Sequence, residues 1–142
     1  MKTKQPLILL AIDDLYVRLF TEAILQESGL LYKLSLVEDS KELRTYIRRD
    51  DKYGDPRVSP RPHLLLMDLA MVRDDGWVIL WEVESTFNWQ QIPIVLLDTI
   101  TRGDIQIPCY DPPENSLTEL TTFGSLVEVI KKMDVYRDGM TR

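Results

Sequence analysis

Aspartates that directly follow apolar runs are the residues of this chain best placed to do chemistry. The run LILLAI ends at Asp13 and Asp14, LLLM ends at Asp68, and PIVLL ends at Asp98. Carboxylates that converge raise one another's pKa unless a cation balances them. A site made only of oxygen ligands suits a hard cation such as Mg²⁺. If the three runs share one edge of a sheet, the pattern predicts an acidic site that can bind magnesium.

The elements that must position these aspartates alternate along the chain. Strands are expected at 7–12, 33–37, 64–67, 93–97 and 116–120, and helices at 15–26, 40–49, 77–87 and 123–136. This order predicts an α/β domain, a doubly wound five-stranded parallel sheet with helices on both faces. The carboxyl ends of parallel strands lie at one edge, where α/β proteins place their sites.

Composition narrows the class of protein. The 142 residues are 44% hydrophobic and 28% charged, which predicts one globular domain over residues 1–142. The net charge of −6 disfavours a nucleic-acid partner. A single cysteine, Cys109, excludes an internal disulfide framework. The first apolar run is too short for a signal peptide or membrane span, so a cytoplasmic protein without a membrane partner is expected.

Other chemistry finds little support in the sequence. Phosphate-binding loops, dinucleotide fingerprints and G-x-S-x-G elbows are absent from it. His63 is the sole histidine, so neither a histidine metal site nor a Ser-His-Asp triad can form, and a structural role is expected for it. A magnesium-dependent phosphohydrolase that uses Asp68 is the remaining enzymatic alternative, but no D-x-D follows the strand. The protein is therefore expected not to be an enzyme. For Asp14, capping of the following helix is the alternative to a role in the site.

The segments "LILLAIDD", "HLLLMDLAMVRDDGW" and "IPIVLLDT" resemble the three site-bearing segments of response-regulator receiver domains. Within them, "MDLAMVRDDGW" is similar to the pattern D-L-x-M-P-x-x-D-G. The loop "RRDDKYGDPRVSPRP" and the segment "DIQIPCYD" resemble small single-domain regulators that pair with phytochrome-type histidine kinases.

This resemblance implies a flavodoxin-like receiver fold, a role in two-component signalling and a histidine kinase as partner. It implies that Asp68 accepts a phosphoryl group. It also implies that Asp13, Asp68 and the backbone carbonyl of Ala70 bind Mg²⁺, with Asp14 as a further candidate if the acidic pair is shifted by one residue.

Several positions depart from the family pattern. Ile12 stands where the first acidic residue is usual, and Asp98 stands where a Ser or Thr normally ends the fourth strand. The adjacent Thr99 is expected to point away, because side chains alternate along a strand. The family's lysine aligns with Glu119, or with Leu120 after a shift. The fourth helix, residues 102–115, is expected to be disrupted, since an interior proline costs a helix about 3 kcal/mol.

These departures lead to a prediction about function. A receiver-like domain is expected in which phosphorylation is impaired or lost and which acts as a protein-interaction module. Its expected partners are a histidine kinase of the phytochrome type or a second copy of the chain. The alternative is a conventional receiver that accepts a phosphoryl group on Asp68.

Overall fold

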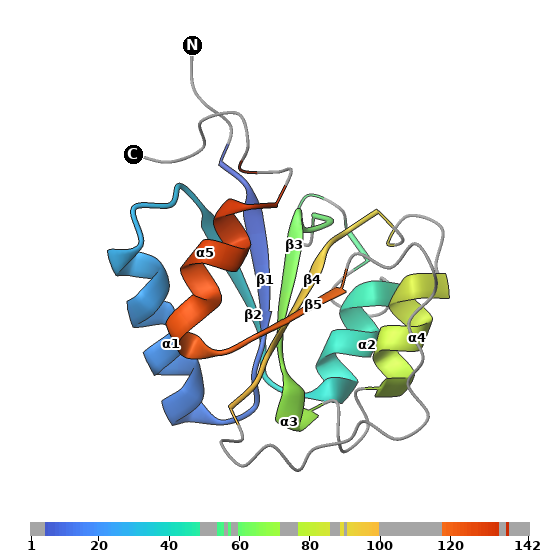
Figure 1. Cartoon of the computed structure of the whole chain (residues 1–142). Helices are drawn as coiled ribbons and strands as arrows, with labels where there is room; N and C mark the ends of the chain where they lie inside the picture. Colours follow the sequence, from blue (N-terminus) through green and yellow to red (C-terminus); the bar gives the residue numbers. More distant parts are fainter. Residues whose placement is uncertain are drawn as a thin grey trace.

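One parallel sheet organises the chain in the computed structural model, which describes residues 5–48, 54, 55, 57, 60–71, 77–85, 89, 91–99, 118–133 and 136. The strands are β1 (Leu7–Ala11), β2 (Lys33–Val37), β3 (Leu64–Asp68), β4 (Ile94–Leu97) and β5 (Thr118–Thr121). They are all parallel, in the order β2-β1-β3-β4-β5 (Figure 1). The chain runs outward from β1 in both directions, so the crevice between the carboxyl ends of β1 and β3 is the place where such sheets bind ligands. The predicted five-stranded parallel sheet is confirmed.

Helices cover both faces of this sheet, because both faces of its central strands are apolar. The helices are α1 (Leu15–Glu27), α2 (Ser40–Arg48), α3 (Leu69–Met71), α4 (Trp77–Ser85) and α5 (Leu126–Lys131), with a 3-10 turn, η3 (Phe123–Ser125), before α5. Alternate strand residues feed two core clusters. Leu9 and Met67 pack with α2 and α4, whereas Leu10 and Leu66 pack with α1 and α5. The two pairs of helices accordingly lie on opposite sides of the sheet in Figure 1. Among the described helices, none is long and apolar enough to cross a membrane.

The largest differences from the predicted boundaries lie in the last two elements. β5 ends one residue later than predicted, at Thr121, and the last helix, predicted over 123–136, is the short α5 after η3. The cause is the polar sequence TELTT, which has no clear apolar alternation to fix the strand's limits. The predicted disruption of the fourth helix at 102–115 lies outside the described residues.

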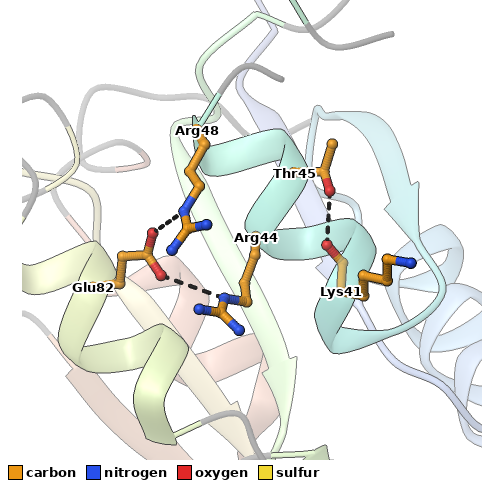
Figure 2. Close-up of polar contacts among 5 residues, drawn as sticks. All are labelled: Lys41, Arg44, Thr45, Arg48 and Glu82. Atoms are coloured by element: carbon orange, nitrogen blue, oxygen red, sulfur yellow. Dashed lines mark hydrogen bonds and ion pairs between the residues drawn. The ribbon is translucent and has the colours of Figure 1, made fainter. Parts of the chain in front are cut away.

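An ion-pair network joins α2 to α4 on the outside of the sheet. Arg48 Nε donates to Glu82 Oε1 at 2.6 Å, and Arg44 Nε lies 3.6 Å from Glu82 Oε2. Figure 2 shows this one carboxylate between the two guanidinium groups. Both arginine side chains are more than 40% exposed, so each pair contributes little by itself, about 0–1 kcal/mol. The network links the two helices that follow β2 and β3.

At the amino edge of the sheet, His63 pairs with Leu7. The His63 backbone N donates to Leu7 O at 2.8 Å, and Leu7 N donates to His63 Nδ1 at 2.9 Å. The imidazole nitrogen thus serves as the hydrogen-bond acceptor for the first backbone N–H of β1. The expected structural role of His63 agrees with these contacts.

Candidate functional site

Asp68 ends β3 inside the protein. Only 1% of its surface is exposed. Its Oδ1 accepts two hydrogen bonds, from Ala70 N at 2.9 Å and from Thr99 Oγ1 at 2.7 Å. The first bond forms because the chain turns into α3 directly after the strand, which brings the Ala70 amide back toward the carboxylate. The apolar strand and its turn therefore hold Oδ1 in a defined position at the carboxyl edge.

The pKa of Asp68 is raised above its ordinary value. Burial is the largest cause, because it disfavours the charged form. The hydrogen bonds from Thr99 and Ala70 lower the pKa, but the nearby charges of Asp13 and Asp14 raise it again. The net result is a carboxylate whose negative charge is poorly compensated and which would gain from a bound cation.

Asp13 and Asp14 follow β1 and are both exposed, while Ile12 before them is fully buried. Asp14 is the N-cap of α1. Its Oδ1 accepts from Tyr16 N at 2.8 Å and from Val17 N at 3.1 Å. The capping alternative for Asp14 is therefore confirmed, and Asp13 remains the member of the pair without a local structural role among these contacts.

Thr99 presents its side chain to Asp68. The prediction that Thr99 points away is wrong, because β4 ends at Leu97 and strand alternation does not extend to residues 98 and 99. The backbone N of Asp98 donates to Thr121 O at 2.7 Å, which completes the hydrogen bonding between β4 and β5 beyond the last pair, Leu97 and Thr121. The charges that raise the pKa of Asp68 include those of Asp13 and Asp14.

The position expected for the family's lysine also changes. Glu119 is exposed and pairs with Val95, in the middle of β5. Thr121 is level with Leu97, which is itself level with Asp68. It is only 5% exposed, and its hydroxyl donates to Thr122 O at 3.2 Å. Thr121, two residues after Glu119, is therefore the β5 residue in the row of Asp68.

The described residues fit a divalent cation in chemistry. Mg²⁺ takes one or two carboxylates together with carbonyl, water and phosphate oxygens. The carboxylates of Asp13 and Asp68 and the carbonyl of Ala70 match that donor set, and a cation would offset the repulsion that raises the pKa of Asp68. Across the described ranges no three His, Cys, Asp or Glu side chains gather closely enough to hold a metal by themselves. Waters or a phosphoryl group would have to complete the shell.

Sequence reasoning found Asp68, Asp13 and Asp14 but missed the inward hydroxyl of Thr99 and the edge position of Thr121. The available signal for Thr99 was that the apolar run PIVLL ends at Leu97, so strand alternation need not continue to residue 99. For Thr121 the signal was weaker, since it required the register between β4 and β5.

Comparison with known proteins finds response regulators among the proteins similar to this chain. No protein-family model matches the chain. The response regulator Rcp1 of Synechocystis sp. is 26% identical over 128 residues, which cover 84% of this chain and 84% of Rcp1. The solved structure of the phosphorylated cyanobacterial phytochrome response regulator RcpA is 28% identical, with a TM-score of 0.60 over 71% of this chain and 70% of RcpA.

The Mn²⁺-bound form of Rcp1 matches the fold over almost the whole length. Its TM-score is 0.70 at 23% identity, and the match covers 96% of this chain and 99% of that one. At this identity the match supports the fold alone. With the sheet order and the sequence relatives, it establishes the receiver fold.

Proposed function

We propose that this chain, a receiver-like domain of two-component signalling with the fold of response regulators, works as a protein-interaction module in which Asp68 is a weak phosphoryl acceptor. Its proposed role is binding and not catalysis, and its proposed location is the cytoplasm. The first candidate partner is a histidine kinase of the phytochrome type, because RcpA is described as a phytochrome response regulator.

One observation carries the proposal. The row that runs from Asp68 through Leu97 to Thr121 brings no cationic side chain to the acceptor. A phosphoryl group on Asp68 would add negative charge beside Asp13 and Asp14, whose charges already disfavour ionised Asp68. A lysine in place of Thr121 would supply an attraction of roughly 3 kcal/mol at ~5 Å and an effective dielectric of ~20. Even half of that energy corresponds to about a tenfold change in rate or equilibrium.

The rival function is a conventional phospho-receiver. It is favoured by the Thr99 hydroxyl, which reaches Asp68 Oδ1 at 2.7 Å and could donate to a phosphoryl oxygen there. It is also favoured by the phosphorylated state of RcpA. The two proposals share one acceptor and differ in how readily that acceptor is labelled.

Magnesium is part of both proposals. When bound, a divalent cation would neutralise charge on the acceptor and the incoming phosphoryl group. Asp13, Asp68 and the Ala70 carbonyl would hold it. Thr99 and the Ala70 amide would keep Oδ1 oriented, which leaves Oδ2 as the oxygen that attacks a phosphoryl group.

The test is phosphoryl labelling by a small acyl phosphate with Mg²⁺, followed by intact-mass spectrometry. We expect slow, partial labelling that is lost in Asp68→Asn. Thr121→Lys should raise the rate or lifetime of the label by about tenfold. Thr118→Lys is the matched control, because it adds the same charge to the same strand roughly 10 Å away. Rapid, stoichiometric labelling of the unmodified protein at Asp68 would establish the rival function.

A further inference from the structure

Two arginines of α2 share one carboxylate of α4 on the outside of the sheet. Arg48 Nε donates to Glu82 Oε1 at 2.6 Å, whereas Arg44 Nε lies 3.6 Å from Glu82 Oε2. The second distance is too long for a hydrogen bond. The Nε atom of Arg44 is buried and has no hydrogen-bond partner among the described residues. One negative charge thus serves two positive charges, and the guanidinium group of Arg44 is the less compensated of the two.

The two arginines are more accessible than the carboxylate between them. The side chains of Arg44 and Arg48 are 43% and 49% exposed, whereas that of Glu82 is 20% exposed. Figure 2 shows both arginine side chains turned toward α4, where Glu82 lies between their guanidinium groups. A ligand that approaches from solvent would therefore meet more positive than negative surface.

A third cation lies on the same helix. Lys41, Arg44 and Arg48 follow one another at intervals of three and four residues, so they start from one line along α2. At ~1.5 Å per residue this line is roughly 10 Å long. Lys41 is exposed, and its side chain is turned away from α4 in Figure 2. Because a lysine side chain rotates freely in solvent, it can extend the positive surface to a ligand held by the arginines. We call these three residues the α2 basic row.

The α2 basic row is a narrow positive strip on an acidic protein. The chain has a net charge of −6, yet here three cations face the single carboxylate of Glu82. Negative residues border the strip. Glu42 follows Lys41 directly and lies about 100° further around the helix, and Asp39 is exposed at the amino end, where its Oδ1 accepts from Glu42 N at 2.7 Å. A short acidic segment fits such a strip, whereas a broad polyanion would also meet the bordering carboxylates.

We propose that the α2 basic row binds a short acidic segment of a partner protein, with one carboxylate of that segment at the guanidinium group of Arg44. This inference rests on the proposed role as an interaction module, and it names a surface and the chemistry of its partner. The bond from Arg48 to Glu82 shows how a carboxylate is accepted at this place. A second carboxylate would give Arg44 the charge-assisted hydrogen bonds that Glu82 does not supply.

The experiment uses the full chain and fluorescence anisotropy with three short labelled peptides. The first carries a run of glutamates, the second has glutamine in place of each glutamate, and the third has lysine there. We expect saturable binding of the glutamate peptide and at least about tenfold weaker binding of the other two. Because the contact is made between exposed charges, binding of the glutamate peptide should weaken as the salt concentration rises.

Substitutions locate the surface. Arg44→Gln and Arg48→Gln should each weaken binding of the glutamate peptide by about threefold, and the double variant by about tenfold, as expected for exposed ion pairs. Lys131→Gln is the matched control, since it removes the same charge from an exposed position of α5, on the opposite side of the sheet (Figure 1). It should change binding by less than about twofold. Urea unfolding should show that all these variants are folded, because each replaces a partly or fully exposed side chain.

Removal of the competing carboxylate gives the sharpest test. Glu82→Gln should strengthen binding of the glutamate peptide by about threefold, because both guanidinium groups lose the charge they now share. Weaker binding in Glu82→Gln would overturn the proposal. Equal binding of the glutamate and glutamine peptides, or equal losses in Arg44→Gln and Lys131→Gln, would overturn it as well.

Further measurements separate the other occupants and the two proposals. A dimer in sedimentation that Arg44→Gln dissociates would assign the row to a second copy and overturn the acidic-segment proposal. Stronger binding to phosphatidylserine vesicles or to duplex DNA than to the glutamate peptide, lost in Arg44→Gln, would overturn it equally. Asp68→Asn should bind the glutamate peptide as well as the unmodified protein does. Rapid labelling of Asp68 with intact peptide binding would overturn only the proposed function, and slow labelling without peptide binding would overturn only this inference.

Discussion

Replacing Asp68 by asparagine should stabilise the protein at neutral pH when no divalent cation is present. The amide keeps an oxygen that can accept from Ala70 N and Thr99 Oγ1, so both hydrogen bonds persist as neutral ones. Two bonds to a charged group become two bonds to a neutral group, a loss of about 2 kcal/mol in all. Against this, removing a charge that is 1% exposed recovers several kcal/mol of desolvation. The raised pKa of Asp68 means that desolvation wins, and we expect a net gain of about 1 to 3 kcal/mol.

The sign follows from proton linkage. The folded protein holds the Asp68 proton more tightly than the unfolded chain, whose carboxyl has its ordinary pKa of 3.8. Below that pH both states are protonated and the charge costs nothing. As the pH rises through the raised pKa of the folded state, Asp68 ionises and the free-energy cost of its buried charge reaches its full size. The free energy of unfolding therefore falls.

The assay is urea unfolding followed by tryptophan fluorescence, in EDTA, at neutral and at acidic pH. The increase in the free energy of unfolding in Asp68→Asn should be present at neutral pH and absent at acidic pH. Glu119→Gln, at an exposed position of β5, is the control and should change stability by less than about 0.5 kcal/mol. A loss of stability in Asp68→Asn at neutral pH would refute the reasoning that burial outweighs the two hydrogen bonds.

Four further outcomes are expected. Saturating MgCl₂ should raise the melting temperature of the unmodified protein by linkage, and Asp13→Asn should reduce that rise; equal rises in both would contradict Asp13 as a ligand. Asp14→Ala should cost about 1 kcal/mol of unfolding free energy through loss of the α1 cap, measured in urea. His63→Phe should cost about 1 to 3 kcal/mol, because Leu7 N–H loses its acceptor, and amide exchange at Leu7 should accelerate. Burial raises the pKa of Tyr136 to about 12, so its contribution is complete below pH 10 and is lost as pH approaches 12; Tyr136→Phe should unfold with a shallower dependence on alkaline pH.

Apolar periodicity was sufficient to predict the sheet. Three of its strands are continuous apolar runs, and each ends at a carboxylate or within two residues before one. Such runs are buried on both faces, which only a parallel sheet covered by helices provides. β5 could not be predicted as well, because TELTT forms an edge strand whose outer residues are exposed, and its pairing with β4 depends on register more than on composition.

The sequence was sufficient to predict the site residues that lie at the ends of strands, but not the residues around them. Asp68 and the pair at Asp13 lie where the strands terminate, so sequence alone places them at one edge. Thr99 depends on a shift of one residue, which exchanges the face on which a side chain lies. Thr121 depends on a shift of two residues, which keeps the face but moves the residue along the strand to the row of Asp68. The structure corrects both positions for that reason.

The turn between β1 and α1 joins the acceptor site to the first helix. Asp13 and Asp14 raise the pKa of Asp68, and Asp14 also caps the first turn of α1. A cation held by Asp13 and Asp68 would offset this repulsion and favour the ionised form of Asp68. The free-energy cost of the Asp68 charge should therefore shrink when Mg²⁺ is added, and Asp68→Asn should then lose its stability advantage over the unmodified protein in urea unfolding.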